Sequence, residues 1–148
     1  MMLRIGLAGA GHFGRFHALK VVASPRARLV AIHDPDAAHA AALARETGSA
    51  VRDWPSLLAE CDAVIIAAPA EAHFALAAAA LRAGRHVLVE KPIAATLPEA
   101  DALAALAAET RRVLQVGHLL RFSAEHQAIS SRIAAPLYIE ATRIAPYK

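Results

Sequence analysis

A glycine-rich run follows directly after the first apolar segment of the chain. Residues 9–14 have the sequence GAGHFG, and a helix-compatible stretch follows them. With the spacing GxGxxG, Gly9 would permit a tight turn, Gly11 would let the backbone approach a pyrophosphate, and Gly14 would let the helix lie close on the sheet. The phosphates would meet a helix N-terminus, whose free N–H groups favour an anion. The run predicts a dinucleotide site, with His12 and Phe13 as further candidate contacts.

An acidic residue ends the next apolar segment. Residues 29–34 have the sequence LVAIHD, and Asp34 lies 25 positions after Gly9, near the spacing at which a carboxylate binds the ribose hydroxyls of a dinucleotide. Pro35 then ends the strand. A carboxylate in this place repels a 2′-phosphate, so the sequence favours NAD over NADP. The alternative is that Asp34 only caps the helix that begins near Asp36.

Composition narrows the class of protein. The 148 residues suffice for one ordinary domain, and no uninterrupted apolar run has the length of a membrane span. The start of the chain shows no secretory signal, and the single cysteine, Cys61, excludes an intrachain disulfide. We therefore expect a soluble, cytoplasmic protein in which Cys61 is a small buried residue.

The charged residues indicate neither a nucleic-acid nor a metal site. The net charge of +3 comes from 13 arginines and 3 lysines against 13 acidic residues, and the arginines are scattered along the chain. The eight histidines are dispersed as well and show none of the usual metal-ligand spacings. We expect no nucleic-acid partner, no membrane association and no metal.

Strand-like and helix-like segments alternate along the chain. This alternation predicts an α/β fold, a doubly wound parallel sheet with helices on both faces. After residue 117 the pattern changes to a short helix near 123–132 and an alternating strand at 137–144. The expected strands of the sheet are 3–8, 28–33, 49–52, 63–67, 86–89 and 113–117, and the expected helices are 13–23, 36–46, 70–83 and 98–110.

Further motifs follow the glycine run and the acidic residue. Ala68 and Pro69 precede His73, residues 83–92 have the sequence AGRHVLVEKP, and residues 113–117 have the sequence VLQVG, followed by Arg121. With these motifs the chain resembles, over essentially its whole length, the N-terminal domain of the glucose-fructose oxidoreductase, inositol dehydrogenase and rhizopine-catabolism (Gfo/Idh/MocA) family. The resemblance implies a Rossmann domain and an NAD(P)-dependent dehydrogenase that acts on CH–OH groups.

The resemblance also implies a second domain that the sequence does not contain. In the family an α+β domain follows the dinucleotide domain, supplies an Asp and a His to the substrate site and forms the oligomer interface. We therefore expect residues 1–120 to be the NAD(P)-binding Rossmann domain and residues 121–148 to be the truncated start of the second domain. A homo-oligomer is expected for the full-length protein.

Glu90 and Lys91 carry the predicted chemistry. They end the fifth strand, where open parallel sheets bind ligands, and Pro92 keeps Lys91 out of helical geometry and allows a cis peptide bond. By resemblance Lys91 is the catalytic candidate, a group that shares in moving the hydroxyl proton of the substrate, and both residues are candidate cofactor contacts. The alternative is a lysine that is ion-paired to Glu90 and merely ends a strand.

Other positions are secondary candidates. Ala68 and Pro69 would offer backbone contacts to the nicotinamide ribose, although Pro69 could simply start the next helix. His73 could point to the cofactor or only satisfy helix packing, and His17 is expected to support the site from within the first helix. His118 and Arg121 follow the sixth strand as weak substrate candidates; Arg121 could bind a carboxylate or phosphate, or pair internally.

Three classes of function remain open at this point. The first is the cofactor half of an NAD-dependent oxidoreductase that acts on a secondary alcohol of a sugar, a cyclitol or a sugar nucleotide. The second is a non-catalytic nucleotide-binding module, and the third is an inactive truncated fragment. Residues 117–122, GHLLRF, are similar to segments of dehydrogenases of UDP-linked amino sugars.

Overall fold

The computed structural model describes residues 2–130, 132–135, 137, 138, 140, 142 and 144. The chain divides into two compact units, Met1–Gly117 and His118–Lys148, which are described separately. No helix among the described residues combines the length and the apolar character needed to cross a membrane.

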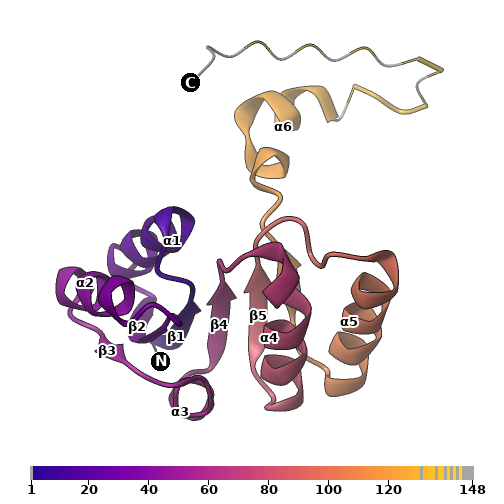
Figure 1. The fold of residues 1–148 in the computed structure, drawn as a ribbon. Helices are drawn as coiled ribbons and strands as arrows, with labels where there is room; N and C mark the ends of the chain where they lie inside the picture. Colours follow the sequence, from indigo (N-terminus) through magenta and orange to yellow (C-terminus); the bar gives the residue numbers. More distant parts are fainter. Residues whose placement is uncertain are drawn as a thin grey trace. The chain divides into compact units, whose positions relative to one another are not determined.

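The first unit is built on one parallel sheet of six strands (Figure 1). The strand order is β3-β2-β1-β4-β5-β6, so the chain starts in the middle and winds outward in both directions. This order confirms the doubly wound sheet predicted from the sequence, and it puts the switch point between β1 and β4. The strands are β1 Leu3–Ala8, β2 Ala27–His33, β3 Ala50–Val51, β4 Ala63–Ile66, β5 His86–Val89 and β6 Leu114–Val116.

Two buried clusters flank the sheet and confirm helices on both faces. One cluster joins α1 and α2 to side chains such as Leu7 and Ile32, and the other joins α3, α4 and α5 to side chains such as Ile66 and Val89. Because successive strand residues point to opposite faces, central strands such as β4 contribute to both clusters. The helices are α1 His12–Val22, α2 Ala37–Thr47, α3 Trp54–Glu60, α4 Ala70–Arg82 and α5 Leu97–Thr110.

Helix α3 was not among the predicted elements. The Asp53 side chain accepts the Ser56 N–H at 2.8 Å and caps the helix, and Pro55 lies in its first turn. Leu57 and Leu58 are buried and fix the helix to the sheet. The cap and the proline are the signal in the sequence, but seven residues are too few for a clear helical period.

The second unit contains a 3₁₀ turn at Leu119–Phe122 and helix α6 at Ala124–Ser130. This helix falls within the range predicted at 123–132. The strand predicted at 137–144 includes residues 139, 141 and 143, which lie outside the described residues, so it stays a prediction. The assignment of 121–148 to a second domain stays a prediction too.

An ion pair joins the starts of two adjacent strands. The Arg4 guanidinium donates to both carboxylate oxygens of Asp62, at 3.1 and 2.6 Å, and the Arg4 backbone N–H donates to the same carboxylate at 2.9 Å. These hydrogen bonds, the guanidinium's first, lower the pKa of Asp62 from 3.8 to about 2. The pair thus ties β1 to β4 across 58 positions of sequence.

We expect this ion pair to make the free energy of unfolding depend on pH in the acidic range. Since the pKa of Asp62 is lower in the folded state, its contribution is complete above the ordinary value of 3.8 and is lost as the pH falls through about 2. The loss in the free energy of unfolding should be small, because the Arg4 guanidinium is exposed to solvent. Urea unfolding between pH 5 and pH 2 measures it. Asp62→Asn should reduce the change in the free energy of unfolding between pH 5 and pH 2, whereas the control Asp101→Asn on α5 should not. The same pH dependence in the two variants would contradict the assignment to Asp62.

Candidate dinucleotide-binding site

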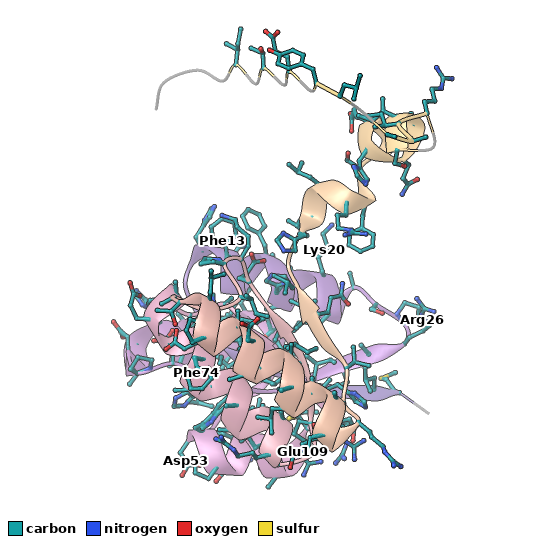
Figure 2. All side chains as sticks on the ribbon, turned by 90° about the vertical axis from the view of Figure 1, so that its right-hand side faces the viewer. Phe13, Lys20, Arg26, Asp53, Phe74 and Glu109 are labelled. Carbon is teal, nitrogen blue, oxygen red and sulfur yellow. The ribbon has the colours of Figure 1, made fainter. Side chains whose placement is uncertain are left out.

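A hollow of about 630 Å³ opens at the carboxyl ends of β1, β2 and β4. Its size is that of a pocket for a nucleotide-sized molecule. Phe13, whose ring stands out from the first turn of α1, is half exposed at its rim (Figure 2). The lining consists of Ala8, Gly9, Gly11, His12, Phe13, His33, Asp34, Pro35, His39, Ala67, Ala68, Pro69, Ala72, Ala75 and Leu76.

The glycine turn is shaped by close backbone contacts. Gly9 has a φ of 98°, and a Cβ at this position would collide with the backbone of Ala67 at the end of β4. A Cβ at Gly14 would collide with the carbonyl of Gly9, so Gly14 lets α1 lie against the turn itself. A Cβ at Gly11 would meet nothing within 4 Å, because this residue faces the hollow. The backbone at Gly11 is therefore open to a ligand, as the pyrophosphate role requires.

Helix α1 begins without a side-chain cap. Its N-cap is Gly11, and its first turn contains no acidic residue. Asp36, Asp53 and Thr96 cap α2, α3 and α5 with hydrogen bonds to the backbone, and α4, which also lacks a side-chain cap, has Glu71 in its first turn. The free N–H groups and the positive end of the dipole of α1 therefore remain for an anion at the hollow.

Asp34 connects the glycine turn to the loop after β2. One carboxylate oxygen accepts the Ala10 N–H at 2.6 Å, and the other accepts the Asp36 N–H at 2.8 Å. The residue that caps α2 is Asp36, which accepts the N–H groups of Ala38 and His39. The alternative that Asp34 caps this helix is therefore wrong. Asp34 lines the hollow, and its carboxylate has lone pairs left for ribose hydroxyls.

Glu90 is a buried carboxylate between three elements. One oxygen of Glu90 lies 2.8 Å from His17 Nε2 on α1, and the other accepts the Lys91 N–H at 3.2 Å. Gly117, after β6, makes room for this group, since a Cβ there would lie 2.9 Å from the carboxylate atoms. His17 thus contacts Glu90 from within α1, and its support of a functional site stays a prediction.

Lys91 is exposed beside this buried group, and the peptide bond to Pro92 is cis, as the sequence allowed. Within the described residues, no carboxylate lies within ion-pair distance of the Lys91 side chain. The alternative of a Lys91–Glu90 ion pair is therefore wrong: Glu90 pairs with His17 and holds only the Lys91 backbone. The ammonium of Lys91 remains available at the carboxyl end of β5.

His73 does not line the hollow. It is 1% exposed, and its two ring nitrogens lie 2.7 Å from the Pro92 carbonyl and 2.8 Å from the Ala68 carbonyl. The geometry supports the packing alternative and gives no direct cofactor contact. Ala68 and Pro69 do line the hollow, and Pro69 is also the N-cap of α4.

His118 and Arg121 belong to the second unit, where both are exposed. Their predicted contact with a substrate stays a prediction. Among the described residues, no three His, Cys, Asp or Glu side chains form a group that could hold a metal ion.

Several lining residues were missed by the sequence reasoning. His33 directly precedes Asp34, and its Nδ1 donates to the Arg52 carbonyl at 3.2 Å, so the ring is held at the mouth of the hollow. Its place at the strand end was the available signal. Ala72, Ala75 and Leu76 share one face of α4, a spacing that the alanine-rich sequence concealed because it fits a core face equally well.

These features define a dinucleotide-binding domain of the Rossmann type. The family model described as the oxidoreductase family with an NAD-binding Rossmann fold, GFO_IDH_MocA, matches residues 3–118. The chain belongs to this family, and its first unit is the family's NAD-binding domain. The resemblance inferred from the sequence is confirmed.

Individual relatives share the domain. UDP-N-acetylglucosamine 3-dehydrogenase of Acidithiobacillus ferrooxidans is 44% identical, covering 99% of this chain and 47% of its own length. Its solved structure superimposes with a TM-score of 0.84 at 41% identity, covering 89% of this chain and 44% of that one. Inositol 2-dehydrogenase of Rhizobium meliloti is 36% identical over 90% of this chain and 41% of its own. The structure of GenD2 from gentamicin A biosynthesis, solved with NAD, gives a TM-score of 0.86 at 32% identity, covering 90% of this chain and 39% of that one.

The chain spans less than half the length of these relatives. The matched part includes the family's NAD-binding domain.

We expect Gly117→Ala to disturb the Glu90 carboxylate. The new Cβ would force the carboxylate away from His17 and the Lys91 N–H, and the free energy of unfolding should fall by about 1 to 3 kcal/mol. Chemical denaturation measures the loss, and the NMR signals of the His17 ring report the contact. In a Glu90→Ala background the same change should cost much less, because the clash is gone. Equal costs in the two backgrounds would contradict this account.

Proposed function

We propose that this chain is the cofactor-binding half of an NAD-dependent dehydrogenase that oxidises a secondary alcohol of a sugar, cyclitol or sugar nucleotide. The observation that supports the proposal is the set of groups that gather at one edge of the sheet. There the uncapped start of α1, the Asp34 carboxylate and Lys91, which has no ion-pair partner among the described residues, all lie at the carboxyl ends of parallel strands.

The residues present fit a dinucleotide in a single direction. Asp34, at the end of β2, would accept hydrogen bonds from the adenosine ribose, and the backbone near Gly11 would hold the pyrophosphate. The nicotinamide would then extend past the switch point toward β4 and β5, where Ala68, Pro69 and Lys91 lie. His12 and Phe13, which line the hollow at the start of α1, would border the cofactor.

The proposed chemistry is a hydride transfer with a matched proton transfer. Bound NAD⁺ supplies the hydride acceptor. Lys91 would contact the substrate hydroxyl, take part in removing its proton and stabilise the developing negative charge on oxygen. Glu90 would hold the Lys91 backbone in place without neutralising the ammonium, because its carboxylate is engaged with His17.

The proposed substrate class is supported by the relatives and by one segment of this chain. Relatives are named as dehydrogenases of UDP-N-acetylglucosamine and of inositol. Residues 117–122, with His118 and Arg121, extend the sequence similarity beyond the sheet; Arg121 is suited to a phosphate or carboxylate of the substrate. We place a UDP-linked amino sugar first and a cyclitol second. Comparing NADH formation with UDP-N-acetylglucosamine and with myo-inositol, in a protein that joins this domain to the family's second domain, distinguishes them.

The assembly and location of that protein belong to the same proposal. The second domain forms the oligomer interface in the family, so a homo-oligomer is proposed. The one cysteine, Cys61, is buried and free, which fits a reducing cytoplasm.

We predict that the 148-residue chain binds NAD more tightly than NADP, because the Asp34 carboxylate occupies the place of a 2′-phosphate. Asp34→Ala should weaken NAD binding by about 1 to 3 kcal/mol and bring the affinities for NAD and NADP closer together. Titration calorimetry with both cofactors measures this. Equal or tighter binding of NADP to the unchanged chain would overturn the assignment of Asp34.

The controls separate recognition from local folding, since Asp34 also holds the Ala10 and Asp36 N–H groups. Asp34→Asn keeps an acceptor oxygen but removes the charge, so it should narrow the preference with a smaller loss of NAD affinity. Asp53→Ala removes a cap of similar chemistry at α3, outside the hollow. It should lower stability and leave the ratio of the two affinities unchanged.

We predict further that the chain alone binds cofactor without measurable turnover, because a substrate would lack most of the walls that orient it. In the protein with both domains, Lys91→Ala should lower kcat far more than it weakens NAD binding, because the lysine acts on the developing alkoxide. Steady-state rates and cofactor affinities decide this. Near-normal turnover of that variant would return Lys91 to a structural role, and robust dehydrogenation by the chain alone would contradict the placement of the site.

A further inference from the structure

A buried histidine bridges two backbone segments that border the proposed nicotinamide side of the site. His73, the fourth residue of α4, is 1% exposed. Its Nε2 lies 2.8 Å from the Ala68 carbonyl, just after β4, and its Nδ1 lies 2.7 Å from the Pro92 carbonyl, just after Lys91. The ring thus joins segments that are 24 positions apart in sequence.

The contacts have a direct chemical consequence. A carbonyl oxygen only accepts hydrogen bonds, so a neutral imidazole ring donates its one N–H to one of the two carbonyls, and only a ring protonated on both nitrogens donates to both. The imidazole carries two nitrogens that point in fixed, different directions from a rigid ring. The ring therefore fixes the distance between the two carbonyl oxygens that it contacts. Because the ring is buried, a replacement without donors would leave both carbonyls without this partner.

We propose that His73 is a positioning residue that holds the Ala68–Pro69 segment and the Lys91–Pro92 segment at a fixed spacing on the nicotinamide side of the cofactor site. The inference rests on the proposed function, because it assigns these two segments to the nicotinamide half of a bound dinucleotide. It assigns no contact between His73 and the cofactor, since His73 is not among the residues that line the hollow. The adenosine side, with Asp34 and the glycine turn, has its own hydrogen bonds and does not depend on this bridge.

The experiment compares two ligands that share one half. NADH and ADP-ribose both contain the adenosine and the pyrophosphate, but only NADH contains the nicotinamide. In the 148-residue chain, His73→Leu should weaken NADH binding by about fivefold to tenfold, which corresponds to about one hydrogen bond, and leave ADP-ribose binding within about twofold. His73→Gln keeps an amide donor in the same place and should recover part of the NADH affinity. NADH fluorescence and calorimetry give the affinities, and circular dichroism verifies the fold.

A matched control distinguishes positioning from general stability. His86, at the start of β5, accepts the Val113 N–H on Nδ1 at 3.0 Å and is not part of the hollow. His86→Leu should lower the melting temperature without changing the ratio of the two affinities. If His73→Leu does not fold, the ratio in His73→Gln against that in the control decides the matter.

The outcomes separate the two levels of the proposal. If the unchanged chain binds neither ligand, the proposed function fails, and the role of His73 fails with it. If the chain binds both ligands but with equal affinity, or if the His73 variants weaken both ligands in equal proportion, the positioning role is overturned while the proposed function stands. Unchanged NADH affinity in a folded His73→Leu variant overturns it as well.

Discussion

The contact between the glycine turn and its neighbours governs the geometry of the whole carboxyl edge of the sheet. The turn passes so close to the end of β4 that Gly9 has no room for a side chain, and α1 lies so close to the turn that Gly14 has none either. Both contacts place the start of α1 over the switch point between β1 and β4. The hollow, the orientation of the helix dipole and the reach of Asp34 to the Ala10 N–H all follow from this approach.

A second set of constraints holds the other half of the same edge. There two polar side chains are buried and paired: Glu90, just after β5, with His17, and His73 of α4 with two backbone carbonyls. A buried polar group without a partner would be costly, so each pair also restricts where the chain can go. Glu90 binds α1 to β5, and His73 binds α4 to the segment after β5. Lys91 therefore emerges from a backbone that is held on both sides, while its own side chain remains exposed.

The sequence was sufficient for features that depend on local rules. The alternation of segments, the glycine spacing and the acidic residue after β2 predicted the sheet and the place of Asp34, since a parallel sheet leaves few topologies open. Pairing between distant residues could not be predicted. Nothing near Glu90 in sequence indicates that it pairs with His17, 73 positions away, and so the adjacent Lys91 was a reasonable but wrong alternative. His73 remained ambiguous for the same reason, since both of its acceptors are backbone atoms, which leave no trace in residue identity.

The distribution of helix caps links the fold to the proposed cofactor. Helices α2, α3 and α5 begin with Asp or Thr side chains that satisfy backbone N–H groups, and α5 has a full capping box. Stability alone would favour such a cap on every helix, because each contributes about 1 kcal/mol. Helices α1 and α4 lack such a cap. Helix α4 begins after Pro69 and has the acidic Glu71 in its first turn, whereas α1 begins with Gly11, has no acidic residue there and lies beside a hollow lined by its own first turn. A side-chain cap would occupy the N–H groups that a pyrophosphate needs, so the missing cap is a cost that ligand binding can offset.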